Sequence, residues 1–498
     1  MKKKAIYNNF IGAFSSFAFL FLTGIVLLPY YFKFISISDY GIWLGGVSFL
    51  SLVSVFEANI SLILTQQLCD KWINKKLVEF SKYLSAAIFF GFAVGVLVVI
   101  GTFFLKDTLT MWLNSEKHIN ELFSSSFFLY SISLSLTIIS GYFNSVSQVF
   151  LKTLLPPFFN IIASILGIAY TIWAVPTQGV LAIALGNLVK GFVYSLLLGI
   201  YIFNILNKEK ITLRFEFIYI INLIKNIGLP FISKVGMTLA VSFQNFIVAS
   251  IISSTATTVF DITKKIPAIV QMLINMIAVS AFTSFSLFYS EQKSSKETHE
   301  YTKHYFSFIR ILLYFSLTGV FLLGQDFITF WVGIDKFGGN LLLALLCMSA
   351  LTDQLRIILA LQYYAIGKFN LTAIADTIFA ISFMAFAFSL IPHFQLVGIV
   401  LSGIFANIIY FAFCFYLEKK YNLNMIANII NRGLFFDLAL IILVAGIAKF
   451  IYELFGSHII IGAFTIFITF VILCIAFYRK EKSLINFLVF KFGRASKI

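Results

Sequence analysis

Long apolar stretches alternate with short polar segments along the whole chain. About fourteen of these stretches are long enough to cross a bilayer as helices, since a span needs roughly 20 apolar residues. We expect spans near 8–32, 42–69, 83–105, 122–151, 157–175, 180–206, 227–252, 266–290, 310–332, 341–366, 371–391, 397–417, 433–452 and 459–478. The pattern predicts an all-α polytopic membrane protein with about 14 transmembrane helices.

The spans fall into two groups of six, separated by a basic amphipathic segment. We expect an N-terminal six-helix lobe at 1–206, a cytoplasmic linker at 207–225 and a second six-helix lobe at 226–418. Two extra helices and a basic cytoplasmic tail would occupy 419–498. A two-lobed transporter has this layout, with its substrate path between the lobes.

A weak internal repeat supports the two lobes. The first span opens with Asn-Phe-Ile-Gly at 9–12, and the seventh opens with Asn-Ile-Gly at 226–228. The segment at 37–42 has a faint counterpart at 257–262. Each counterpart is followed by an apolar span and then by a basic loop. The two halves therefore agree better in the order of these features than in amino-acid identity.

The composition agrees with a membrane protein and excludes a soluble one. The chain is 60% hydrophobic and 11% charged, with a mean hydropathy of +0.97. Its formal net charge of +15 does not indicate a nucleic-acid partner, because the basic residues lie in short clusters between apolar spans. Four cysteines without a close pair argue against a disulfide framework or a zinc site.

The basic clusters also predict the orientation. Alternate loops carry most of the lysine and arginine, as the positive-inside rule requires of cytoplasmic loops. An even number of spans then places both termini in the cytoplasm. We expect a multi-pass protein of the bacterial inner membrane with an uncleaved first helix. The strongest clusters lie at 71–82, 208–225, 293–310, 419–432 and 479–497.

The opening hairpin, residues 8–69, has the most specific pattern. No charged residue lies between Ala5 and Phe32, a polar break follows at 33–39, and residues 40–43 read Tyr-Gly-Ile-Trp. The second apolar run contains an acid, Glu57, near its middle. This hairpin resembles that of the polysaccharide-lipid flippases, the bacterial exporters of O-antigen or capsule repeat units in the MATE-like MOP superfamily.

The resemblance implies a substrate and a mechanism. The substrate would be an oligosaccharide on a polyprenyl diphosphate, moved to the outer leaflet for polysaccharide or lipopolysaccharide synthesis. Its diphosphate cannot cross hydrocarbon unaided, so lysines and an arginine lining a closed cavity would stabilise it. Alternating access would come from the two lobes rocking about that cavity. The resemblance implies no enzyme activity and no cofactor beyond a coupling proton or sodium ion, bound at Glu57 or Asp353.

Polar side chains inside apolar spans are the candidate cavity residues, because lipid-facing charges are costly. Glu57 and Asn59 lie on the second span, where a hydrogen bond between packed helices is the competing interpretation. Lys190 lies on the sixth span; we place it near the cytoplasmic half, where snorkelling explains it better than function.

The seventh span carries three further candidates, Lys234, Gln244 and Asn245. In one continuous helix, residues eleven apart share nearly the same face at ~100° per residue. Lys234 and Asn245 are spaced in this way. One polar face on an otherwise apolar helix indicates an aqueous cavity.

Two more groups contain charges of both signs. Asp261 can pair with Lys264 or Lys265 at helical spacing, which leaves one lysine to meet an anionic group at the outer mouth. Asp353 and Arg356 in the tenth span have i,i+3 spacing and can neutralise each other in the core. For the second pair, a structural or gating role and a substrate contact are equally open. Asp376 lies nearer a span end, where a structural role is favoured.

Several alternatives remain open. A MATE-type cation or drug antiporter would favour acids over lysines in its cavity. A peptidoglycan-precursor flippase shares the fourteen helices and the cationic cavity. A membrane glycosyltransferase or polymerase needs larger outer loops than this chain offers, and a non-transporting scaffold leaves the in-span charges unexplained. For the flippase, a polysaccharide polymerase and chain-length machinery are candidate partners, and we expect a monomer in the lipid bilayer.

Overall fold

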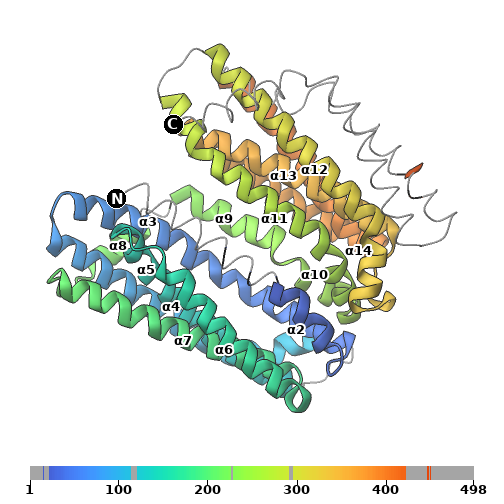
Figure 1. Ribbon diagram of the computed structural model, residues 1–498, viewed down its shortest axis with the longest axis horizontal. Helices are drawn as coiled ribbons and strands as arrows, with labels where there is room; N and C mark the ends of the chain where they lie inside the picture. Colours follow the sequence, from blue (N-terminus) through green and yellow to red (C-terminus); the bar gives the residue numbers. More distant parts are fainter. Residues whose placement is uncertain are drawn as a thin grey trace, which may run out of the picture. The chain divides into compact units, whose positions relative to one another are not determined.

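The computed structural model describes most of the chain. The described residues are Ser15, Phe19, 22–113, 121–225, 228–290, 295–421, Gly446, Ile447 and Lys449, and within them the side chains of 54–59, 62, 229–230, 279–290, 295–304 and 369 are left out. Every element in this part of the chain is a helix (Figure 1). The predicted all-α class is confirmed.

Contacts divide the chain into two compact units, Met1–Thr258 and Val259–Ile498, which we call unit 1 and unit 2. The boundary falls inside α11 and not in the predicted linker at 207–225, because α9 and α10 pack on the helices of the opening hairpin. The predicted lobes at 1–206 and 226–418 are the two bodies that we expect to move against each other during transport. Contacts within one structure do not test such a movement. The lobes stay a prediction.

Unit 1 contains the opening hairpin and the helices that pack on it. Its α2 begins after Ser36, whose hydroxyl accepts a hydrogen bond from the N–H of Asp39 at 3.0 Å and caps the first turn. The elements are α2 (Ile37–Leu50), η1 (Ser51–Val53), α3 (Ser54–Ile73), α4 (Leu77–Leu113), α5 (Glu121–Val149), α6 (Leu155–Gln178), α7 (Val180–Lys208), α8 (Ile218–Lys225), α9 (Gly228–Val241) and α10 (Gln244–Ile251). The second predicted span is therefore α2 and α3, joined by the short 3-10 turn η1.

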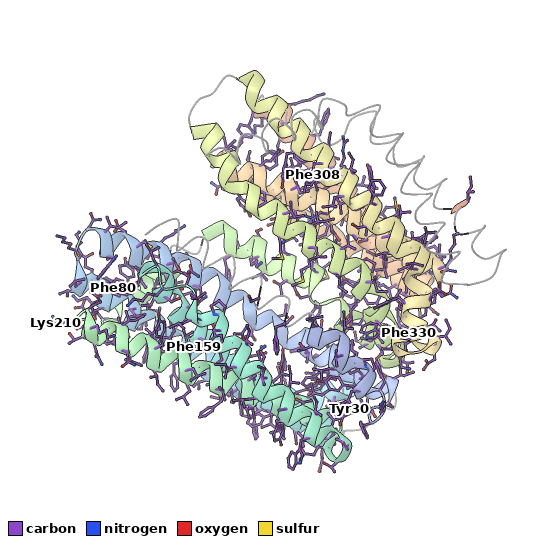
Figure 2. The ribbon with its side chains drawn as sticks, in the orientation of Figure 1. Tyr30, Phe80, Phe159, Lys210, Phe308 and Phe330 are labelled. Atoms are coloured by element: carbon purple, nitrogen blue, oxygen red, sulfur yellow. The ribbon has the colours of Figure 1, made fainter. Side chains whose placement is uncertain are left out.

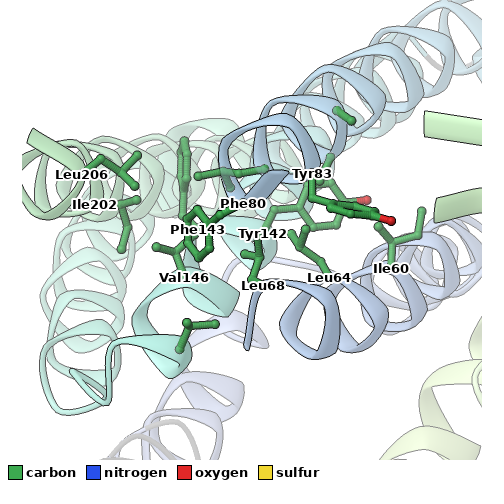
Figure 3. Packing of buried hydrophobic residues seen from close by; sticks show 14 of the residues in the cluster. Ile60, Leu64, Leu68, Phe80, Tyr83, Tyr142, Phe143, Val146, Ile202 and Leu206 are labelled. Carbon is green, nitrogen blue, oxygen red and sulfur yellow. The ribbon is translucent and has the colours of Figure 1, made fainter. Parts of the chain in front are cut away.

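The core of unit 1 lies between α3, α4, α5 and α7 (Figure 3). Leu64, Phe80, Leu84 and Tyr142 are completely buried there. Small residues let the helices approach closely: a Cβ on Gly91 would lie only 2.4 Å from the Tyr142 ring. Close packing of this kind drives helix association in a bilayer, where the hydrophobic effect contributes little between helices.

In its described residues, unit 2 contains four long helices and a short turn: most of α11 (Ser254–Ser290), α12 (Ser295–Val332), η2 (Ile334–Lys336), α13 (Asn340–Ala365) and α14 (Phe369–Tyr421). The last of these corresponds to two predicted spans, 371–391 and 397–417. They meet at Gln395, whose backbone is not helical (φ 48°, ψ −126°), three residues after Pro392. Prolines and positive φ angles both interrupt helices, so the sequence correctly predicts two spans here.

Among the described residues, the same turn occurs once in each unit. Gly179, between α6 and α7, has φ 54° and ψ −126°, and it also lies three residues after a proline, Pro176. Gly179 and Gln395 are 216 positions apart, close to the offset between the segments at 9–12 and 226–228. The two turns support the predicted internal repeat at a place where the sequence analysis found no signal.

The helices have the length and composition of membrane spans. In the described part of the chain, seven helices are long and apolar enough to cross a membrane, or eight if the bent pair α9–α10 is counted as one span. Large apolar side chains cover their outward faces, among them Phe330 at 93% exposure (Figure 2). The chain is a multi-pass membrane protein. The predicted spans at 433–452 and 459–478 lie outside the described residues, apart from Gly446, Ile447 and Lys449.

Candidate transport site

The seventh predicted span is broken. α9 ends at Val241, α10 begins at Gln244, and the two axes differ by 46°. The Thr238 carbonyl accepts from the N–H groups of the next two residues beyond α9, at 2.9 and 3.2 Å, so the helical hydrogen-bond pattern ends there. The expected continuous helix over 227–252 is wrong. Lys234 on α9 and Asn245 on α10 therefore do not share a face of one continuous helix.

Side chains replace the hydrogen bonds that the break removes. The Ser48 hydroxyl of α2 donates to the Ser242 carbonyl, and the Gln244 side-chain amide donates to the Ala240 carbonyl at 2.9 Å. Backbone groups freed at membrane depth need such partners, so breaks occur where a helix contacts protein or a water-filled cavity. In secondary transporters, broken spans commonly form the substrate site.

α2 packs on α10 and on the first turn of α11 along a face of small residues. Four of them, at successive spacings of three, four and three, form what we call the α2 seam: Ser38, Gly41, Gly45 and Ser48. A Cβ on Gly41 would come within 1.8 Å of the Ser254 carbonyl oxygen, and one on Gly45 within 2.9 Å of the Ala249 Cβ. Only glycine allows the helices to lie this close.

Hydroxyl groups hold the seam together. The Ser38 and Ser254 hydroxyl oxygens are 2.7 Å apart, and the Thr258 hydroxyl donates to the Ile37 carbonyl at 2.6 Å. The segments 37–42 and 257–262, which the sequence analysis paired as repeat counterparts, thus meet at their first residues.

The Tyr-Gly-Ile-Trp element is a packing element. Tyr40, Ile42 and Trp43 are each at most 7% exposed. The Trp43 ring lies 6.3 Å from the Phe127 ring and 5.4 Å from the Tyr130 ring of α5. The residues that carry the family resemblance therefore fix α2 between α5 on one side and α10 and α11 on the other.

Unit 2 contains a buried charge cluster around Arg356 of α13. One guanidinium nitrogen lies 3.7 Å from Asp353, as the i,i+3 spacing predicted, and the other lies 3.5 Å from Asp376 of α14. The guanidinium also lies over the Phe379 ring at 4.4 Å. With two carboxylates and an aromatic face around it, Arg356 is held as a structural link between α13 and α14.

The second half of α14 also reaches this cluster. The Asn407 side-chain amide donates to Asp353 at 3.0 Å and to the Thr352 hydroxyl at 3.1 Å. Ser349 donates to the other carboxylate oxygen of Asp353 at 3.4 Å. Asp353 is therefore engaged by protein groups on both oxygens, which makes it less suited to bind a coupling ion than the sequence analysis expected.

The group on α11 divides as the spacing allowed. Lys265 forms the i,i+4 ion pair with Asp261, one of the two pairings that the spacing allows, whereas the predicted cavity role of these residues stays a prediction. Lys264 lies over the Phe260 ring at 5.5 Å and is close enough to Asp353 for their charges to interact. The α11 group and the Arg356 cluster, separate in the sequence, are thus electrostatic neighbours within unit 2.

The other predicted residues occupy less defined places. Glu57 and Asn59 lie in the first turns of α3, but their side chains are outside the described part of the chain. Lys234 on α9 is exposed, and Gln244 and Asn245 on α10 are half-buried next to the break.

Lys190 lies nearer the other end of its helix than predicted. It is the eleventh of the 29 residues of α7, and α7 begins at the Gly179 turn. The lysine is thus about 16 Å from that turn and about 27 Å from Lys208, at 1.5 Å per residue. With the predicted orientation, in which α7 runs from the outer side to the cytoplasm, this position is in the outer half of the helix; the orientation itself stays a prediction.

Sequence reasoning missed three features. Asp376 was given a structural role at a span end, and it is the second partner of Arg356. Asn407 and the α2 seam were not singled out at all. Asn407 is a single amide in an apolar run, and the sequence does not show which residue of another helix such an amide contacts. The seam could have been found from its small residues at helical spacing.

No protein-family model matches the chain, and no curated protein matches its sequence. Solved structures do match. A structure described as the lipid II flippase MurJ in an inward closed conformation has a TM-score of 0.74 and 16% identity, covering 94% of this chain and 98% of its own.

Other transporters match over a smaller part of this chain. An inward-facing multidrug resistance MATE transporter of the MOP superfamily has a TM-score of 0.60 and 15% identity, covering 76% of this chain and 93% of its own. A MOP superfamily transporter from Pyrococcus furiosus, described as having a binding pocket of reverse polarity, has a TM-score of 0.60 and 14% identity over 86% and 97%. The chain has the fold that these flippases and transporters of the MOP superfamily share.

Proposed function

We propose that this protein is a flippase for polyprenyl-diphosphate-linked oligosaccharide repeat units. It would carry them from the cytoplasmic to the outer leaflet of the bacterial inner membrane, for O-antigen, capsule or lipopolysaccharide synthesis. The observation that carries the proposal is the fold shared with a lipid II flippase over nearly the full length of both chains. The resemblance of the Tyr-Gly-Ile-Trp element to the polysaccharide-lipid flippases supports the polysaccharide branch. No enzymatic reaction is part of the proposal.

The available cations fit an anionic head group. Lys234 is exposed on the broken span, and Lys264 is held over an aromatic ring at the end of a charge cluster. A compact ammonium group binds phosphate oxygens as a point charge, without requiring one fixed geometry. Arg356 has its guanidinium occupied by two carboxylates and is not proposed to touch substrate.

The α2 seam supplies a closure for the outer end. With the predicted orientation, α2 begins on the outer side. The seam joins α2 to the broken span α9–α10, which is the first span of the second predicted lobe. Hydroxyl contacts such as Ser38 with Ser254 can be exchanged for water at little net cost. A closure made in this way can open and close in each transport cycle, as alternating access requires.

A MATE-type cation antiporter is the main alternative function. MATE transporters share the fold with TM-scores near 0.6. An antiporter for cations would place unpaired acids in its cavity. In the described residues, Asp261, Asp353 and Asp376 are all paired with lysine or arginine. This pairing favours the anionic substrate.

The test uses cells that lack this protein. The flippase predicts loss of surface polysaccharide together with a complete lipid-linked repeat unit retained on the cytoplasmic leaflet, both restored by the wild-type gene. Normal surface polysaccharide with new sensitivity to cationic drugs would establish the antiporter instead. Incomplete or unpolymerised sugar chains would show that the protein acts as a glycosyltransferase or polymerase.

A further inference from the structure

Residues 207–225, the linker, are fastened along the first turns of α4. The Ser81 hydroxyl donates to the Thr212 carbonyl and accepts from the N–H of Arg214 at 2.8 Å. Lys82 pairs with Glu216 at 2.5 Å. These contacts make the linker a fixed part of unit 1 and not a loose tether.

One side of the linker is buried and the other is exposed. Ile220 and Leu223 of α8 enter the core cluster, and the Tyr219 ring meets the Tyr83 ring edge-on at 4.7 Å. Large apolar side chains point the other way, with exposed fractions between 40% and 63%: Leu213, Phe215, Phe217, Ile218 and Ile224. Leu213, Phe215 and Phe217 precede α8, whereas Ile218 and Ile224 lie on it. An exposed apolar face on an amphipathic segment is typical of chain that lies in a membrane interface.

The exposed face continues the lipid-facing surface of α4. The Phe215 ring lies 4.8 Å from the ring of Phe89, which is half-exposed. From there an uninterrupted outward strip runs along α4 through Phe92, Val96, Leu97, Ile100, Phe103 and Phe104. Phe89 to Phe104 spans about 22 Å, most of the ~30 Å thickness of a bilayer core. The linker therefore lies where α4 enters the hydrocarbon.

Basic residues accompany this apolar face. Lys208, Lys210, Arg214 and Lys225 are exposed, whereas the linker contains two acids, Glu209 and Glu216, and the second is paired with Lys82. Lys210 lies at the same end of unit 1 as Phe80, and Tyr30 lies at the opposite end (Figure 2). The exposed charge is thus positive at the level where phospholipid head groups begin.

We propose that the linker is an interfacial anchor that binds anionic phospholipid head groups with Lys208, Lys210, Arg214 and Lys225, while its exposed phenylalanines enter the acyl region. The occupant is the bilayer itself. Continuity with the lipid-facing strip of α4 and the sign of the charge both favour a lipid surface over a protein partner. The proposal is independent of the transported substrate.

The test measures which lipid lies next to Phe217. In full-length protein whose own cysteines are replaced, a fluorophore on Phe217→Cys is reconstituted with a nitroxide-labelled phosphatidylglycerol or phosphatidylcholine. We expect quenching by both lipids, about threefold stronger with the anionic one. The matched control is Leu97→Cys, which is 66% exposed on the lipid-facing strip, where we expect no head-group preference.

A charge variant completes the test. With Lys208, Lys210, Arg214 and Lys225 changed to glutamine, the anionic preference at Phe217→Cys should fall to that of the control. Unchanged quenching at Leu97→Cys shows that this variant is still inserted. The proposal is overturned if the fluorophore at 217 is not quenched by either lipid while the one at 97 is, or if both lipids quench it equally in the native linker.

Discussion

The α2 seam and the Arg356 cluster both hold helices together within the membrane, but with opposite chemistry. The seam uses glycines and hydroxyls, such as Gly41 against Ser254. The cluster uses a buried guanidinium between two carboxylates. Separating the seam exposes small polar groups, whereas separating the cluster leaves charges without partners. We therefore expect movement at the seam and permanence at the cluster.

Locking the seam should have the largest effect on transport. In a background without native cysteines, Ser38→Cys and Ser254→Cys replace hydroxyl oxygens that are 2.7 Å apart and should form a disulfide on oxidation. We expect transport to be nearly abolished and then restored by reductant.

The matched control for the seam is a pair within one helix bundle. Ser140 and Ser195, on α5 and α7, also have hydroxyl oxygens 2.7 Å apart. Cross-linking them should leave transport unchanged, because both helices belong to the same predicted lobe at 1–206. If the seam disulfide formed fully and transport continued, the seam would not be a closure.

Breaking the cluster should have the largest effect on stability. Arg356→Leu leaves Asp353 and Asp376 without their cation, so we expect the free energy of unfolding to fall by about 3–5 kcal/mol. Thermal unfolding of the purified protein in detergent measures this, with Lys234→Leu as the exposed control. A shift no larger than that of the control would show that the cluster does not link α13 and α14.

Removing the exposed lysine should separate function from stability. Lys234→Ala is expected to lower transport about tenfold, equivalent to ~1.4 kcal/mol of substrate interaction, because a cation at the broken span is lost. Membrane insertion and the unfolding temperature should not change, since Lys234 is exposed. Lys234→Arg should recover part of the activity. If Lys234→Ala transported at the normal rate, Lys234 would not contact the substrate.

The smallest effect concerns the repeated turn. Gln395 has φ 48°, a conformation that favours glycine, and Gly179 occupies the corresponding place in unit 1. Gln395→Gly should therefore stabilise the protein, by up to about 1 kcal/mol. The unfolding temperature of the purified variant checks this. Destabilisation would mean that the glutamine side chain contributes more than the backbone strain costs.

Sequence predicted the fold much better than the site. Apolar runs of bilayer length are a direct consequence of the solvent, so the class and most spans could be read without tertiary information. The helix break at Ser242 could not, because its replacement hydrogen bond comes from Ser48, nearly two hundred residues earlier.

The ion pairs show where local spacing is sufficient. Asp261 with Lys265 and Asp353 with Arg356 follow from i,i+4 and i,i+3 positions on one helix. Asp376 lies on another helix, so its link to Arg356 depends on how α13 and α14 pack. The Tyr-Gly-Ile-Trp element was recognised by its letters, but its buried place against Phe127 follows only from the structure.

The most direct test of the proposed function is reconstitution of the purified protein in vesicles with a polyprenyl-diphosphate-linked oligosaccharide. A membrane-impermeant reagent reports the fraction of sugar on the outside, without gradients and with imposed proton or sodium gradients. We expect the wild-type protein to make the sugar that starts on the inner leaflet accessible to the reagent, and the disulfide between Ser38→Cys and Ser254→Cys to prevent this. If, with the wild-type protein, the sugar on the inner leaflet stays protected from the reagent under every gradient, the protein is not a flippase for this class of lipid.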